Sequence, residues 1–135
     1  MFYIPVFGWV LKLSGFVGID RGNHEKAIRS LDRAAERLRG GTSLLIYAEG
    51  TRSPDGSLLP FKKGGFVLAI QAGVPVVPIA IRGSRQVLPK GSLRIRSGTI
   101  NLSVGDPIDP GRYTAETKGE LMEKVRTAME RQLGG

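Results

Sequence analysis

The residues best suited to chemistry form one continuous segment, Glu49, Gly50, Thr51, Arg52 and Ser53. This segment follows an apolar run over 43–48, which predicts a strand buried on both faces. Gly50 permits a sharp turn, the two hydroxyl groups can donate hydrogen bonds, and the planar guanidinium of Arg52 matches a phosphate. Ligands of open α/β sheets bind beyond the carboxyl ends of strands, so the segment predicts an anion site. A tight loop closed by an internal Glu–Arg ion pair is the alternative interpretation.

A second basic residue, Arg21, follows a predicted strand over 16–20. If the two strands are parallel neighbours, Arg21 and Arg52 point into one crevice. Two guanidinium groups beside several backbone N–H groups would hold a phosphomonoester well. Taken alone, Arg21 fits a solvated surface position better than a binding site.

The net charge of +8 is concentrated in the stretch 82–96, which contains no acidic residue. Such a band favours an anionic partner, although a solvated face is the alternative. Single-stranded nucleic acid is bound by aromatic side chains interleaved with basic ones, and this stretch has no aromatic residue, so no nucleic-acid partner is expected. The absence of cysteine excludes disulfides and thiolate metal sites, and the single histidine, His24, excludes a His-rich one.

Four helices are expected from apolar periodicity and from their boundary residues. They are predicted over 4–13, 24–39, 63–72 and 114–133, with Gly40-Gly41 and Gly73 as stop signals and Asn23 and Thr114 as caps. The first is apolar on nearly all sides, which indicates either burial or contact with a membrane interface. Its apolar run meets Lys12 too early to span a bilayer, and no signal peptide is expected.

Two further strand regions are expected in the second half of the chain. The run 74–81 is strand-like, and its two prolines indicate an edge or irregular strand. Segments 93–97 and 99–104 are predicted to pair as a hairpin across Ser97-Gly98. Strands alternating with helices indicate a single α/β domain over 1–135, built on a mixed, mainly parallel sheet flanked by helices.

Taken in order, these segments resemble the 1-acylglycerol-3-phosphate acyltransferase family, within the wider glycerolipid acyltransferases. The resemblance is carried by Gly-Phe-Val-Gly-Ile-Asp-Arg (15–21), Glu-Gly-Thr-Arg-Ser (49–53), Pro-Phe-Lys-Lys-Gly-Gly (60–65) and Val-Pro-Val-Val-Pro-Ile-Ala-Ile (74–81). It implies transfer of a fatty acyl group from acyl-CoA or acyl carrier protein to a lysophospholipid, with no cofactor beyond this co-substrate. It also implies a peripheral protein of phospholipid synthesis at the cytoplasmic face of a membrane.

Carried over by position, Arg21 and the segment Glu49 to Ser53 would hold the acceptor phosphate, and Val74, Pro75 and Pro78 would shape the acyl-donor side. The family's first block, a histidine followed after four residues by an aspartate, supplies the general base. This chain has no such block, because His24 is followed at the corresponding position by Arg29. We therefore expect an N-terminally truncated domain with little activity alone. A non-enzymatic domain that binds lysophospholipid or an anionic membrane is the alternative.

Overall fold

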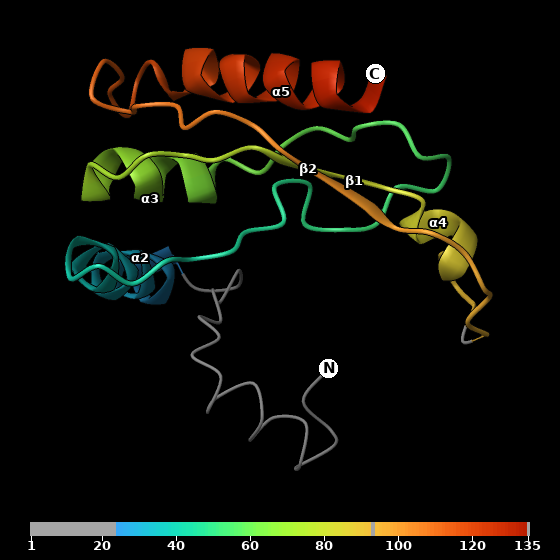
Figure 1. Cartoon of the computed structure of the whole chain (residues 1–135). Coiled ribbons are helices and arrows are strands. Elements are labelled where there is room, and N and C mark those ends of the chain that lie inside the picture. Colours follow the sequence, from blue (N-terminus) through green and yellow to red (C-terminus); the bar gives the residue numbers. More distant parts are fainter. Residues whose placement is uncertain (1–23, 93, 135) are drawn as a thin grey trace.

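The computed structural model describes residues 24–92 and 94–134. Its elements in chain order are α2 (His24–Arg39), α3 (Gly64–Ala72), β1 (Ile79–Arg82), α4 (Ser84–Val87), β2 (Asn101–Val104) and α5 (Lys118–Gly134) (Figure 1). The helix predicted over 4–13 and the strand predicted over 16–20 lie outside the described residues.

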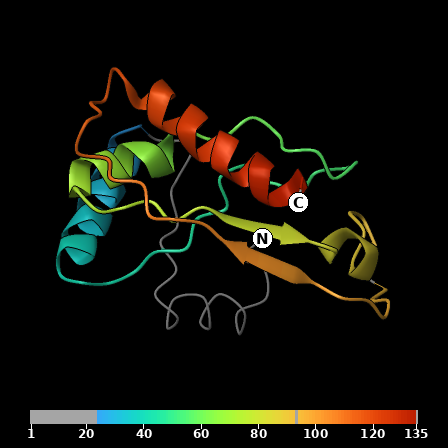
Figure 2. The ribbon, with the colours of Figure 1, turned by 45° about the horizontal axis from the view of Figure 1, so that its top comes forward.

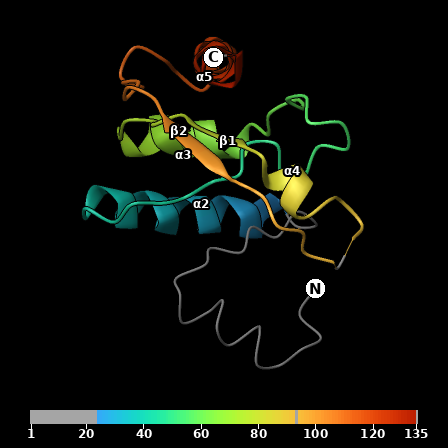
Figure 3. The same ribbon diagram turned by 45° about the vertical axis from the view of Figure 1, so that its right-hand side comes forward.

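Helix α3 is the central layer, between α2 on one side and α5 on the other (Figures 1 and 3). Its residues Leu68 and Ala72 pack with Ala34 and Ala35 of α2. On the other side, Phe66 packs in a cluster that includes the fully buried Leu121 of α5. A helix with apolar residues on all sides needs cover on all sides, and these two neighbours supply much of it.

The helix boundaries largely confirm the predictions. Helix α2 ends at Arg39, directly before the two glycines. Helix α3 ends at Ala72, and the N–H of the following Gly73 donates to the carbonyls of Ala69 and Ile70. Helix α5 starts later than predicted. The Thr114 N–H donates to the Thr117 hydroxyl (2.8 Å), and the Thr114 hydroxyl accepts from the Thr117 N–H (3.4 Å), so a reciprocal cap precedes the helix.

The predicted hairpin is wrong, because β2 pairs with β1 and not with residues 93–97. The pairing is antiparallel and sets Ile79 opposite Val104 and Ile81 opposite Leu102. These apolar cross-strand pairs stabilise the long-range ladder, whereas Ser97-Gly98 lacks the Asn-Gly or Asp-Gly signal of a tight hairpin. This ladder is the only sheet among residues 24–92 and 94–134, so these residues show an α/β structure but no parallel pairing.

The segment 43–48, predicted to be a doubly buried strand, pairs with no strand in the described part of the chain. Leu45 and Tyr47 are 71% and 67% exposed. A strand forms only where a neighbouring strand completes its hydrogen bonds. The apolar composition of 43–48 was therefore not enough to predict a strand. The prediction over 74–81 was closer: Val76 forms an isolated bridge with Ile108, and the regular strand begins only after Pro78, as the missing proline N–H groups require.

The two faces of the ladder differ in how far they are covered. Ala80 of β1 is buried on the side covered by α5, which runs over the strands in Figure 2. On the opposite face Leu102 and Val104 are 65% and 69% exposed, next to the partly exposed Ile79 and Ile81. The described residues therefore leave an apolar sheet face uncovered.

Gly83 makes the turn from β1 into α4 and thereby fixes where α4 lies. Its φ is 84°, in the left-handed region, and a Cβ at this position would overlap the backbone carbonyl oxygen of Thr99. Gly91 has the same φ of 84°, but a Cβ there would meet nothing within 4 Å. The two glycines thus share one backbone requirement and differ in the space around them.

This pair generates a stability prediction. Gly91→Ala should lower the free energy of unfolding by about 1 kcal/mol, the cost of a left-handed alanine. Gly83→Ala should lower it by roughly 2–4 kcal/mol, because the Thr99 backbone must also move. Urea unfolding followed by circular dichroism measures both. Equal losses in the two variants would show that the approach of Thr99 imposes no constraint.

Candidate functional site

The segment predicted to bind an anion lies on a loop whose two ends meet. The Gly50 N–H donates to the Tyr47 carbonyl (3.0 Å), and Gly50 has a φ of 69°, which confirms the sharp glycine turn. After the excursion the chain returns, and the Lys62 N–H donates to the Ala48 carbonyl (2.7 Å). We call residues 49–61 the closed loop.

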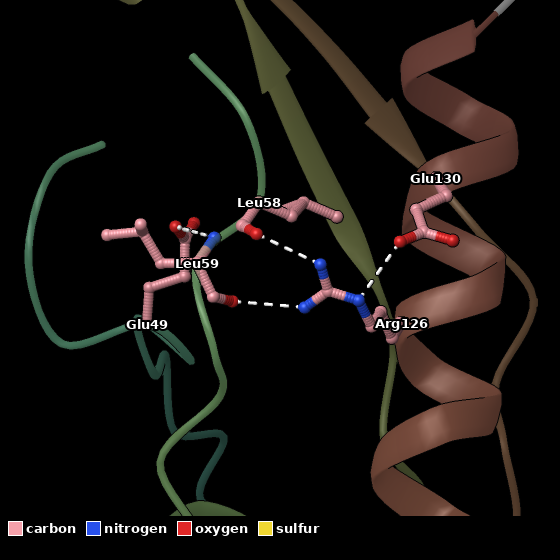
Figure 4. A network of polar contacts seen from close by, with 5 residues as sticks. All are labelled: Glu49, Leu58, Leu59, Arg126 and Glu130. Carbon is pink, nitrogen blue, oxygen red and sulfur yellow. Dashed lines mark hydrogen bonds and ion pairs between the residues drawn. The ribbon is translucent and has the colours of Figure 1, made fainter. Parts of the chain in front are cut away.

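Glu49 closes this loop from within. Its carboxylate oxygen Oε2 accepts a hydrogen bond from the Leu59 N–H at 2.8 Å, and the residue is half-buried (Figure 4). It forms no ion pair with Arg52, so the alternative interpretation of an internal Glu–Arg pair is wrong. The carboxylate of Glu49 therefore shapes the loop and does not neutralise the positive charge of Arg52.

Arg52 is exposed on the outer side of the loop. Its Nη1 donates to the carbonyl oxygen of Leu88, directly after α4, at 3.3 Å. A guanidinium has five N–H donors, and the others of Arg52 have no partner among the described residues. The exposed hydroxyl of Thr51 lies next to it in the chain. These groups are available to an anion.

The tip of the loop is a turn centred on the carboxylate of Asp55. Its Oδ1 accepts from the Ser57 hydroxyl (2.7 Å), the Ser57 N–H (3.0 Å) and the Ser53 hydroxyl (2.9 Å). These bonds, that from the Ser57 hydroxyl first, lower the pKa of Asp55 from its ordinary value of 3.8 to about 2. Ser53 therefore serves the turn. The backbone oxygen of Asp55 accepts from Arg85 Nη1 (3.0 Å), so a second guanidinium ties the loop to α4.

Arg126, which is not among the predicted site residues, connects α5 to the closed loop (Figure 4). Its Nη2 and Nη1 donate to the consecutive carbonyls of Leu58 (2.9 Å) and Leu59 (3.1 Å), and its Nε lies 3.0 Å from Glu130 Oε1. The spacing to Glu130 was visible in the sequence as an i,i+4 pair. The two carbonyls, 67 and 68 positions away along the chain, were not.

The predicted donor-side residues lie in the segment between α3 and β1. Val74 packs against the cluster between α2 and α3, and the buried Pro78 accepts a hydrogen bond from the Gly105 N–H at 2.9 Å. They precede β1, with the exposed Pro75 between them, whereas Arg52 contacts the segment that follows α4 at the other end of β1 (Figure 1). Arg21 lies outside the described residues.

Two clefts, of about 420 and 580 Å³, run along α5 beside residues 106–113. Each is lined by acidic and basic side chains, with Asp106 and Lys124 common to both, so neither has the positive charge that an anion site requires.

Within the described ranges, no three acidic or histidine side chains gather to hold a metal ion. None of the described helices has the length and apolar character needed to cross a bilayer.

Comparison with known proteins identifies relatives over most of the chain. The chain is 40% identical over 109 residues to the chloroplastic 1-acyl-sn-glycerol-3-phosphate acyltransferase BAT2 of Brassica napus. This match covers 80% of this chain and 32% of the relative. It is 37% identical over 131 residues to a 1-acyl-sn-glycerol-3-phosphate acyltransferase of Saccharomyces cerevisiae, covering 94% and 43%. The chain thus spans less than half the length of these relatives.

A solved structure shows the same fold. The crystal structure of the 1-acyl-sn-glycerophosphate acyltransferase PlsC from Thermotoga maritima superposes with a TM-score of 0.72 at 37% identity, over 81% of this chain and 44% of that protein. Residues 1–82, which include the closed loop, α3 and β1, match the sequence model of the family described as Acyltransferase. The motifs, the fold and this match agree, and the chain belongs to the Acyltransferase family.

Proposed function

We propose that this chain is the acceptor-binding part of a 1-acylglycerol-3-phosphate acyltransferase of phospholipid biosynthesis. The reaction moves a fatty acyl group from the thioester of acyl-CoA or acyl carrier protein to the free hydroxyl of 1-acylglycerol-3-phosphate. The observation that carries the proposal is Arg52, an exposed guanidinium on a loop that the side chains of Glu49 and Ser53 hold in shape. The relatives named above support the reaction class. They do not favour a purely non-enzymatic lipid-binding domain.

The phosphate site combines charge with a fixed backbone. A phosphate monoester is bound best by bidentate guanidinium groups and further N–H or O–H donors. Arg52 supplies free donors, Thr51 an exposed hydroxyl, and Arg85 a second positive charge beside the same loop. Arg21 would add a further guanidinium. Glu49 and Ser53 contribute by holding the loop, because their side chains bond within it.

The catalytic base is the part of the mechanism that these 135 residues do not contain. An alcohol attacks a thioester efficiently only when a base removes its proton, and this help contributes roughly 10²–10⁴-fold. The only histidine, His24, lacks the aspartate that the family's block places five positions later. We therefore assign binding of the acceptor to this chain, without the proton transfer.

Val74, Pro75 and Pro78 are proposed to shape the acyl-donor side. The reacting hydroxyl of the acceptor lies close to its phosphate, so the thioester carbon must come near Arg52. These three residues precede the other end of β1. They would therefore contact the fatty acyl chain of the donor rather than its reacting carbon.

We further propose that the protein works peripherally at the cytoplasmic face of a membrane and that a mixed, mainly parallel sheet forms once residues 43–48 gain a neighbouring strand. The exposed apolar side chains of Leu45 and Tyr47 support the second point, since such a run is typical of a covered strand. The exposed Lys90, Arg94 and Arg96 support the first, because a basic surface attracts anionic headgroups.

Binding of the acceptor generates a prediction about Arg52. Arg52→Gln should weaken binding of lysophosphatidate by roughly 10- to 100-fold, because charge-assisted hydrogen bonds contribute about 1.5–3 kcal/mol. The matched control is Arg112→Gln, which removes the same charge beside the clefts along α5. Isothermal titration calorimetry below the critical micelle concentration measures both. If both variants lose affinity equally, net charge rather than a site at Arg52 binds the lipid.

Catalysis generates a second prediction. The chain, incubated with acyl-CoA and lysophosphatidate, should form phosphatidate no faster than the uncatalysed control, because no base is positioned to activate the hydroxyl. Thin-layer chromatography of radiolabelled product measures this rate, with a full-length relative such as the yeast enzyme as positive control. Turnover comparable with that of the relative would contradict the assignment of the missing base.

The turn at Asp55 generates a pH prediction. Because folding lowers its pKa, the carboxylate stabilises the loop above the ordinary value of 3.8, and this contribution is lost as the pH falls through about 2. A carbon-13 NMR titration should place the Asp55 midpoint at about 2. Ser57→Ala should raise that midpoint toward 3.8 and leave Glu116, whose pKa is lowered by the Thr114 hydroxyl, unchanged. An unaltered Asp55 midpoint would show that Ser57 does not hold the carboxylate.

A further inference from the structure

We propose that Arg126 is a positioning residue for the closed loop. From α5 it holds the backbone of Leu58 and Leu59, and in this way it sets the position from which Arg52 binds the phosphate. The proposal rests on the function proposed above and adds to it a contribution from the helix, which the family match over residues 1–82 does not include.

The contact between Arg126 and Glu49 passes through one peptide group. The Leu58 carbonyl accepts from Arg126 Nη2 at 2.9 Å, and the N–H of the same peptide unit, that of Leu59, donates to Glu49 Oε2 at 2.8 Å (Figure 4). A cation therefore lies on the oxygen side and an anion on the N–H side. Both polarise the amide in the same sense, so each hydrogen bond strengthens the other.

The guanidinium that makes this contact is itself held on every side. Its third nitrogen, Nε, pairs with Glu130 at 3.0 Å, and its carbon lies 5.5 Å from the ring centroid of Phe61. Phe61 stacks in turn on Phe66 of α3, with ring centroids 5.9 Å apart. The side chain of Arg126 is only 29% exposed. Because two parallel N–H bonds to consecutive carbonyls need a planar fork, a lysine cannot reproduce them.

The connection from Arg126 to the phosphate site is short along the chain. Glu49 precedes the left-handed turn at Gly50, and Arg52 lies two residues further on. If the peptide before Leu59 is released, the carboxylate of Glu49 loses its fixed partner and the turn that aims Arg52 is no longer anchored. The hydrogen bond from Lys62 to Ala48 still closes the base of the loop, so the fold should persist while the geometry loosens.

The test uses Arg126→Met in the full chain, with Arg131→Met as the matched control, because Arg131 is an exposed arginine of the same helix. Arg126→Met should weaken lysophosphatidate binding roughly 10-fold, the size typical when an outer residue that orients a binding group is lost. The amide of Leu59 should exchange its hydrogen faster, while the core amide of Val125 stays protected. Arg131→Met should change neither measurement.

The outcomes separate this proposal from the function on which it rests. If Arg52→Gln weakens binding as predicted above and Arg126→Met leaves the affinity unchanged, the positioning role is wrong and the phosphate site stands. If Arg52→Gln has no effect, the proposed function itself fails.

A double-mutant cycle provides the readout that a merely structural role would not give. Glu49→Gln should reproduce the loss in affinity, and the double variant with Arg126→Met should lose little more, because both act through one peptide. Additive losses would overturn the proposal. If Arg126→Met does not fold, Arg126→Lys replaces it in the cycle, since it keeps the stem and the charge but not the paired bonds.

Discussion

The described structure depends on the burial of α3 between α2 and α5. A nine-residue helix is too short to be stable alone, and its apolar sides must be covered from more than one direction. Leu68 meets α2, and Phe66 meets α5. The closed loop precedes α3 in the chain and packs with it through Phe61, and β1 follows α3. The positions of the loop and of β1 therefore depend on how α3 packs. Loss of either helical neighbour would therefore disturb the candidate site as well as the core.

The closed loop separates the groups that give it shape from the groups available to a ligand. Hydrogen bonds inside the loop are formed by side-chain oxygens of Glu49, Ser53 and Asp55. Arg52 and Thr51 remain exposed, and among the described residues Arg52 is bonded at one nitrogen. A rigid loop that carries few unsatisfied donors binds an anion with little loss of conformational entropy, because the ordering has occurred during folding.

The sheet is the least complete part of the described structure. Helix α5 covers β1 on one side and buries Ala80, but the side chains of Ile81 and Leu102 on the other side remain exposed. An uncovered apolar face of this kind marks a contact with further polypeptide or with lipid. The chain covers 44% of the solved Thermotoga maritima protein.

The sequence by itself determined the helices, the glycine turns and the family. Helices α2 and α3 follow from apolar periodicity and end at their predicted glycines, because helical hydrogen bonds join residues close in the chain. Tertiary structure alone decided the partner of β2, the exposure of most of 43–48 and the contacts of Arg126. Strand pairing and side-chain bonds to distant carbonyls join residues far apart, so no local pattern encodes them. Of the two arginines predicted to share a crevice, Arg52 lies on the closed loop of the described structure. The position of Arg21 remains a prediction.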